Sequence, residues 1–158
     1  MKNKSLTLFE VLLVLTIISI IIGFSFYFFN FFSQSNFVFE ETLNNLVKFI
    51  ETAKEKSKLG EDDANWGVVF VNSTTKNLVQ IVKNNSTNIV FVYDLPNFVI
   101  YLDPPNNSSK LIFFEKFTGK TTSTKVLLKN KNTGLQKYIC IPTSSPSFVS
   151  PSSTCYEF

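Results

Sequence analysis

The feature that most constrains this chain is an uncharged apolar run near its start. Residues 11–29 contain no charged side chain and consist mostly of Ile, Leu, Val and Phe. The run is about 19 residues long, close to the roughly 20 that an α-helix needs to cross the hydrocarbon core of a bilayer. Lys2 and Lys4 precede it, and basic flanks stay cytoplasmic. We therefore expect a single membrane-spanning helix with the bulk of the chain on the far side.

Three interpretations of this segment compete. A secretory signal peptide has a shorter apolar region and a small-residue cleavage motif after it, and residues 28–32 offer no such motif. A plain membrane anchor accounts for the length and the flank but gives Glu10 no role beyond reaching the interface. A carboxylate in a spanning segment costs about 2–3 kcal/mol at depth, and such residues are usually functional or paired.

The third interpretation explains the leader and the acid together. The opening Met1-Lys2-Asn3-Lys4-Ser5, followed by Leu6-Thr7-Leu8-Phe9-Glu10 and an apolar helix, resembles the class III leader of type IV pilins and type II secretion pseudopilins. The resemblance implies cleavage by a prepilin peptidase between Ser5 and Leu6, and N-methylation of Leu6. It also implies that Glu10 forms an assembly salt bridge with the N-terminal amine of a neighbouring subunit. The family usually has Gly before the cut; Ser5 is also small, so we expect permissive or slower cleavage.

The apolar run continues into an amphipathic stretch without a turn signal. No Pro precedes Pro96, and no Gly lies between Gly23 and Gly60. Apolar residues recur at steps of four and three, at Phe39, Leu43, Leu46, Ile50 and Ala53. This spacing predicts one helix over residues 6–58 that Gly60 ends. The polar side chains on its remaining positions, which include Glu51 and Lys54, are expected to face water.

The rest of the chain alternates strand-like runs with turn residues. The predicted strands are rich in Val, Ile, Phe and Tyr and cover residues 66–71, 77–83, 88–93, 98–102, 110–114, 124–128 and 137–141. An antiparallel meander packed on the amphipathic half of the helix would cover the apolar faces of both. The predicted fold class is α+β: a pilin-like long N-terminal helix, its apolar half membrane-spanning, packed on an antiparallel β-sheet domain.

Short motifs in this region sharpen the resemblance. The segment Trp66-Gly67-Val68-Val69-Phe70, then Leu95-Pro96, then Ile112-Phe113-Phe114 with Gly119, is similar to the globular domain of H-type pseudopilins and FimT-like minor pilins. The expected organisation has a leader over 1–5, a transmembrane or filament-core half of the helix over 6–32 and an amphipathic half over 33–59. The β domain follows over 60–158, with a C-terminal disulfide loop.

Cysteines and lysines suggest further sites. In an exported chain, Cys140 and Cys155 are expected to form a disulfide, because two thiolates cannot complete a zinc shell. This bridge would close the Ser- and Pro-rich segment 142–151, which we predict to be a surface loop. Possible polyanion contacts are Lys120, Lys125, Lys129 and Lys131. A solvated strand face explains these lysines equally well, and the chain has no Arg, the residue on which nucleic-acid recognition relies most.

The residues give no support to catalysis. The chain has no His, which removes the commonest general base and metal ligand. The adjacent acids Glu61, Asp62 and Asp63 are expected to face water and not to hold a metal. We predict a protein that is not an enzyme and has no cofactor.

The expected function is that of a minor pilin or pseudopilin, anchored in the cytoplasmic membrane with its globular domain outside the cytoplasm, and then assembled into an extracellular or periplasmic filament. Its expected partners are other pilin or pseudopilin subunits, the prepilin peptidase and the inner-membrane assembly platform. Two alternatives stay open. One is a tip-located binding module for DNA or surfaces, and the other is a membrane-anchored domain that does not polymerise.

Overall fold

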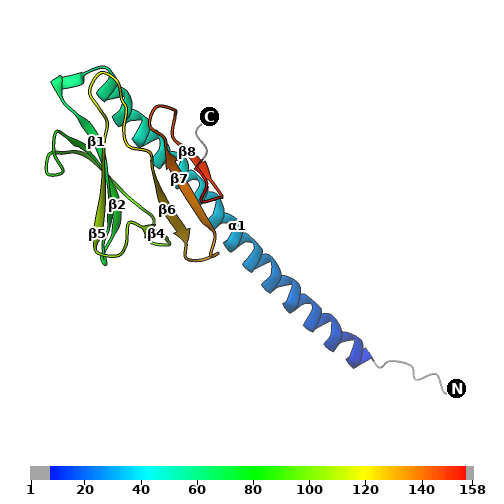
Figure 1. The fold of residues 1–158 in the computed structure, drawn as a ribbon. Coiled ribbons are helices and arrows are strands. Elements are labelled where there is room, and N and C mark those ends of the chain that lie inside the picture. The colour runs from blue at the N-terminus through cyan, green and yellow to red at the C-terminus, as the bar shows by residue number, and fades with distance from the viewer. Residues whose placement is uncertain (1–7, 156–158) are drawn as a thin grey trace.

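The computed structural model describes residues 8–155 and shows one long helix set against two antiparallel sheets (Figure 1). The helix α1 covers Leu8–Lys58 and is followed by the short 3-10 turn η1, Glu61–Asp63. The strands are β1 Trp66–Asn72, β2 Asn77–Lys83, β3 Ile89–Asp94, β4 Val99–Asp103, β5 Ser108–Phe113, β6 Thr124–Asn130, β7 Gln136–Ile141 and β8 Phe148–Ser150. The predicted α+β class is confirmed.

The strands form two sheets where the sequence suggested a single meander. The first sheet has the order β3-β2-β1-β5 and the second β4-β6-β7-β8. Strand β4 does not pair with β3 but with β6 in the second sheet, and the chain then returns to the first sheet, where β5 pairs with β1. Alternation of apolar residues marks where strands lie but does not encode which strands pair, so the expected meander was wrong while all seven predicted strands are present.

The eighth strand lies inside the segment predicted to be a surface loop. Residues 148–150 pair with β7, with Phe148 opposite Cys140 and Val149 opposite Ile139. A three-residue strand is too short to show an alternating pattern, which explains why the sequence did not reveal it. The segment around it is therefore partly ordered as a sheet edge.

The amphipathic half of α1 supplies one wall of the core. All five residues of the predicted apolar face are completely buried, namely Phe39, Leu43, Leu46, Ile50 and Ala53. They join a single cluster with buried residues of both sheets, such as Phe70 of β1 and Leu128 of β6. Burial of each large apolar side chain stabilises the fold by about 1.5–3 kcal/mol. The helix thus holds the two sheets together.

The helix ends where the sequence predicted, at Gly60. This residue has a φ of 63°, a left-handed conformation that glycine adopts without steric cost. A Cβ there would also lie 2.4 Å from an atom of the Phe117 ring. Beside it, the buried Ser57 donates a hydrogen bond from Oγ to the Phe114 carbonyl at 2.7 Å. The end of α1 is therefore fixed to the segment after β5.

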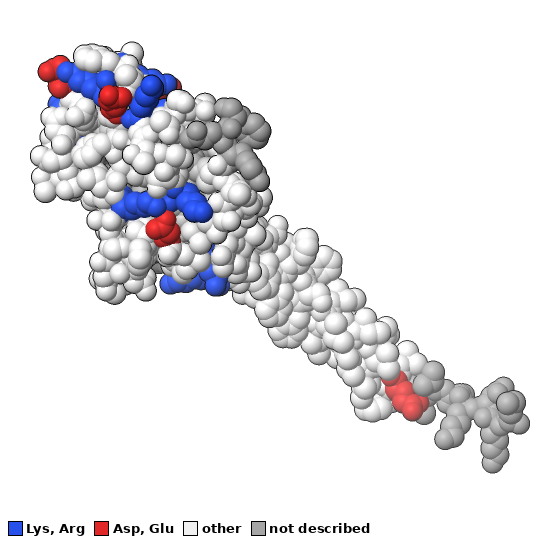
Figure 2. All heavy atoms as spheres, in the orientation of Figure 1, with Lys and Arg blue, Asp and Glu red and all other residues white. Residues whose placement is uncertain are grey.

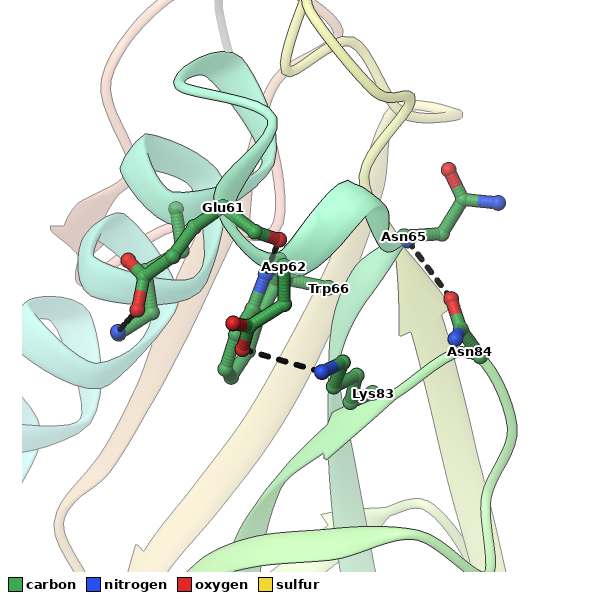
Figure 3. A network of polar contacts seen from close by, with 7 residues as sticks. Glu61, Asp62, Asn65, Trp66, Lys83 and Asn84 are labelled. Atoms are coloured by element: carbon green, nitrogen blue, oxygen red, sulfur yellow. Dashed lines mark hydrogen bonds and ion pairs between the residues drawn. The ribbon is translucent and has the colours of Figure 1, made fainter.

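The acidic turn that follows is held by lysines (Figure 3). Asp62 forms an ion pair with Lys83 at 3.0 Å, and the Glu61 carbonyl accepts a hydrogen bond from the Trp66 indole at 3.0 Å. The Glu61 carboxylate pairs with Lys56 at 2.5 Å, and Asp63 pairs with Lys116. The hydrogen bond and charge of Lys116 lower the pKa of Asp63. These acids are exposed, as expected, but each has a structural ion-pair partner that the sequence did not show.

Candidate functional site

The first half of α1 is an apolar rod that projects from the domain (Figure 1). Every large apolar side chain from residue 8 to residue 32 is exposed, over a range from 41% for Phe32 to 79% for Leu8. Figure 2 shows this half as an almost uninterrupted uncharged surface. Monomeric soluble proteins rarely expose so large an apolar surface, which marks contact with a membrane or another protein.

Three hydroxyl groups inside the rod are hydrogen-bonded within the helix itself. The hydroxyls of Thr16, Ser19 and Ser25 each donate to the carbonyl four residues earlier, at 2.8 Å. A hydroxyl without a partner would cost free energy in hydrocarbon, and these bonds remove most of that cost. The rod is therefore suited to an environment without water.

Within residues 8–155, one helix is long and apolar enough to cross a membrane, and it is α1. A single spanning helix followed by a globular domain is the arrangement of a single-pass membrane anchor. This agrees with the predicted transmembrane segment at the coarse level of one anchor and one domain.

Glu10 lies in the first turn of α1 and is exposed. An acidic side chain is favourable there because the N-terminus of a helix carries partial positive charge. The next charged residue along the chain is Glu40, so Glu10 stands at one end of a long uncharged surface. Ser5 and Leu6, where cleavage and methylation are predicted, lie outside the described residues.

The two halves of α1 meet at a polar cluster, which we call the junction: Ser35, Asn36, Asn130, Asn132 and Thr133. Asn130 is completely buried and donates from Nδ2 to the Ser35 carbonyl at 3.2 Å. Asn132 donates to the Ser35 hydroxyl at 3.2 Å, and Thr133 donates to the Asn36 side chain at 2.8 Å. These bonds fasten the turn between β6 and β7 to the helix just above the rod.

Sequence reasoning missed the junction, although a signal was present. Ser33, Gln34, Ser35 and Asn36 form the one run of four polar residues in the otherwise apolar stretch between Val11 and Phe39. A polar run in that position marks the place where a helix stops facing lipid and acquires polar partners.

Two further residues of α1 hold the C-terminal segment. The prediction of a solvated position was wrong for Lys54, whereas Glu51 is half-buried. Lys54 is only 1% exposed, and its ammonium donates to the Ser145 carbonyl at 2.6 Å and to that of Ser144 at 3.4 Å. Glu51 accepts a hydrogen bond from the backbone N–H of Ser147 at 2.7 Å. Burial lowers the pKa of Lys54, Glu51 acts in the opposite direction, and Lys58 lowers it further. The buried ammonium is tolerated because carbonyl oxygens replace its water.

The disulfide joins Cys140 of β7 to Cys155, with a Cα–Cα distance of 5.6 Å, as expected from the sequence. It closes a loop of 15 residues, which contains β8 and the carbonyls that hold Lys54. Closing a loop of this length stabilises the fold by about 3 kcal/mol in the chain-entropy model. The helix and the disulfide therefore fix the same segment from two sides.

The four lysines proposed as polyanion contacts are distributed along β6 and the segments that flank it. Lys120 precedes β6, Lys125 and Lys129 lie within β6, and Lys131 lies just after it. Lys125 donates to the Ser153 carbonyl at 3.0 Å and lies 5.4 Å from the centre of the Tyr138 ring. On the face shown in Figure 2, basic atoms form separate groups with acidic atoms beside some of them. Polyanion binding by all four together stays a prediction.

Comparisons with models of protein families, with curated proteins and with solved structures found no match for this chain. The arrangement itself, a long N-terminal apolar helix on antiparallel sheets with a disulfide, is compatible with a pilin-like fold. The functional assignment therefore depends on the helix and its surroundings.

Proposed function

We propose that this chain is a pilin-like subunit, a minor pilin or pseudopilin, that is processed at Leu6, N-methylated there and assembled into a type IV pilus or type II secretion pseudopilus. The observation that supports this function most is the division of one continuous helix, Leu8–Lys58, into an exposed apolar half and a half buried against the sheets. Such a rod offers a mostly apolar surface both to lipid and to a helical protein core, and the backbone polar groups are paired within the helix.

Assembly requires specific contacts as well as apolar surface. Lipid tails are as apolar as Leu, so transfer of the rod from lipid to a filament core gains little from the hydrophobic effect. In the proposed assembly, the Glu10 carboxylate of an incoming subunit pairs with the Leu6 amine of its neighbour. Both charges are expensive in a medium of low dielectric constant, and their mutual attraction there is strong. The pair would set the axial register of successive subunits.

The flanking features are compatible with this topology. Lys2 and Lys4 favour a cytoplasmic N-terminus, where a prepilin peptidase acts. The Cys140–Cys155 disulfide supports a domain outside the cytoplasm, because disulfides persist in oxidising compartments. The inner-membrane assembly platform would then extract the anchored subunit into the filament.

The test is the substitution Glu10→Gln in the full chain, expressed with its native assembly machinery. Glu41→Gln is the matched control, since Glu41 is exposed on the amphipathic half of α1. We expect Glu10→Gln to be processed normally but to stay in the membrane fraction, whereas Glu41→Gln enters filaments at the wild-type level. Entry of Glu10→Gln at the wild-type level would contradict the assembly role and favour an anchor that does not polymerise.

A further inference from the structure

The β6–β7 hairpin lies at the level of the membrane surface if the rod spans the bilayer. The apolar run ends near Phe29, and Ser35 follows after six residues, or about 9 Å at 1.5 Å per residue. The head-group layer on each side of a bilayer is about 5–8 Å thick. Tyr27, an aromatic residue with a hydroxyl, lies where interfacial aromatic belts occur. Ser35 therefore lies at the outer edge of the head groups.

The junction brings the hairpin turn down to this level. Ser35 and Asn36 are hydrogen-bonded to Asn130, Asn132 and Thr133. The turn is itself compact, because Gly134 adopts a φ of 76° and donates to the Asn130 carbonyl at 2.8 Å. Figure 1 shows that the turn between β6 and β7 is the part of the domain nearest the exposed half of α1.

The side chains around this turn suit an anionic lipid surface. Lys129 and Lys131 have no ion-pair partner among residues 8–155, whereas Lys137 pairs with Glu40 at 2.6 Å. Leu135 on the turn is 37% exposed and Phe37 on the helix 71% exposed. Lys129 is half-buried at the end of β6, and Lys131 is exposed on the turn that follows it. Their ammonium groups supply attraction to phosphates, and the exposed Leu135 and Phe37 supply partial insertion among lipids.

We propose that this end of the domain, Lys129, Lys131 and Leu135 with Phe37, is a docking surface for the head groups of anionic phospholipids in the membrane that α1 crosses. The proposal rests on membrane insertion of α1, which is part of the proposed function, but not on processing or assembly into a filament. Lipid fits this surface better than nucleic acid, because the anchor holds it against the bilayer. Docking would orient the domain before assembly and would be lost when the subunit leaves the membrane.

Tryptophan quenching in the full chain, reconstituted in phosphatidylcholine vesicles with or without phosphatidylglycerol, tests the geometry. Leu135→Trp places a probe on the turn, and Leu59→Trp, at a residue 78% exposed, places one at the opposite end of the domain. Ile18→Trp places a third probe within the rod. Trp66 is constant in all three variants.

With a nitroxide on the lipid head group, we expect strong quenching of Leu135→Trp and none of Leu59→Trp beyond the Trp66 background. With a nitroxide deep in the acyl chain, Ile18→Trp should be quenched, which reports insertion separately. Quenching of Ile18→Trp together with an unquenched Leu135→Trp would overturn the docking surface while leaving the anchor intact. An unquenched Ile18→Trp would overturn the anchor and the docking surface together.

The charge contribution is tested by adding Lys129→Gln and Lys131→Gln to the Leu135→Trp chain. Lys48→Gln with Lys58→Gln is the matched control, since both lysines are exposed on α1 and neither belongs to the predicted polyanion contacts. We expect phosphatidylglycerol to favour the docked orientation, and the double change near the turn to reduce the ratio of docked to undocked molecules by roughly fivefold per lysine. If the quenching of Leu135→Trp changes neither with phosphatidylglycerol nor with the substitution of these lysines, head-group recognition is overturned. Duplex DNA is added to the anionic vesicles as a competitor. If DNA reduces the quenching of Leu135→Trp, and this reduction disappears when Lys129 and Lys131 are changed to Gln, the lysines bind DNA instead of head groups.

Discussion

The two halves of α1 belong to one continuous helix but satisfy opposite requirements. From residue 8 to residue 34 every described side chain is exposed, whereas from Phe39 onward one face has no exposed surface at all. The first half is apolar on all sides, as a helix surrounded by lipid or other helices must be, and the second has an apolar stripe that faces a sheet. The second half of α1 therefore contributes to the stability of the domain through its packing, whereas the first half is exposed throughout and is free to contact a membrane or other subunits.

This division predicts that equivalent substitutions in the two halves have very different effects on stability. Leu43→Ala in the buried half should lower the free energy of unfolding by about 2–5 kcal/mol, because it removes buried methyl groups and leaves a cavity. Leu15→Ala in the exposed half should leave the domain within about 0.5 kcal/mol of the wild type. Denaturation in detergent, followed by the fluorescence of the buried Trp66, measures both. Equal losses would show that the halves are not independent.

Removal of the disulfide should have the next largest effect. The double substitution Cys140→Ala and Cys155→Ala should lower the free energy of unfolding by about 3 kcal/mol, because it releases the constraint on the unfolded chain. Hydrogen exchange should increase in residues 142–151, and the amides of the rod should be unaffected. An unchanged melting temperature would mean that Lys54 and Glu51 hold this segment without the disulfide.

The junction should contribute less than the core. Asn130→Ala leaves the Ser35 hydroxyl and the Asn132 backbone N–H without a partner that they have in the wild type, at a cost of about 1–3 kcal/mol. Asn44→Ala, on an exposed position of α1, is the matched control and should change little. Hydrogen exchange of the β6–β7 turn would locate the effect, and a uniform increase across both sheets would contradict a local role.

The smallest expected effect is a pH dependence from Lys54. Its pKa is lowered in the folded protein from 10.5, so the unfolded chain binds more protons at this side chain in the interval just below 10.5. The free energy of unfolding should therefore rise with pH across that interval. Comparison of the wild type with Lys54→Met, by chemical denaturation at about pH 8 and about pH 10, isolates this contribution. A wild type that loses stability relative to Lys54→Met as the pH rises would contradict it.

The sequence predicted the parts of the fold that depend on local pattern. The apolar run, the steps of three and four from Phe39 to Ala53, and Gly60 together define α1 and its end, because helix periodicity and a left-handed glycine are local properties. The seven strand positions also follow from local composition.

What the sequence did not predict depends on contacts between distant segments. Strand β4 pairs with β6 and not with β3, and β5 pairs with β1. No single segment of the sequence encodes such a choice of partner. Lys54 and Glu51 belong to a polar face by periodicity, yet the segment after Cys140 folds back and buries Lys54. Asn130 acquires its role from Ser35, 95 positions away. Glu10 was identified through a resemblance, and its role in assembly stays a prediction.

The most direct test of the central claim is the intact mass of the protein recovered from its native membrane or filaments. If the chain is a pilin-like subunit, the mass should correspond to a chain that starts at an N-methylated Leu6. A mass that includes Met1, or one that shows a cut beyond Phe32, would contradict assembly as a pilin and leave the exposed half of α1 as a plain anchor or a signal peptide.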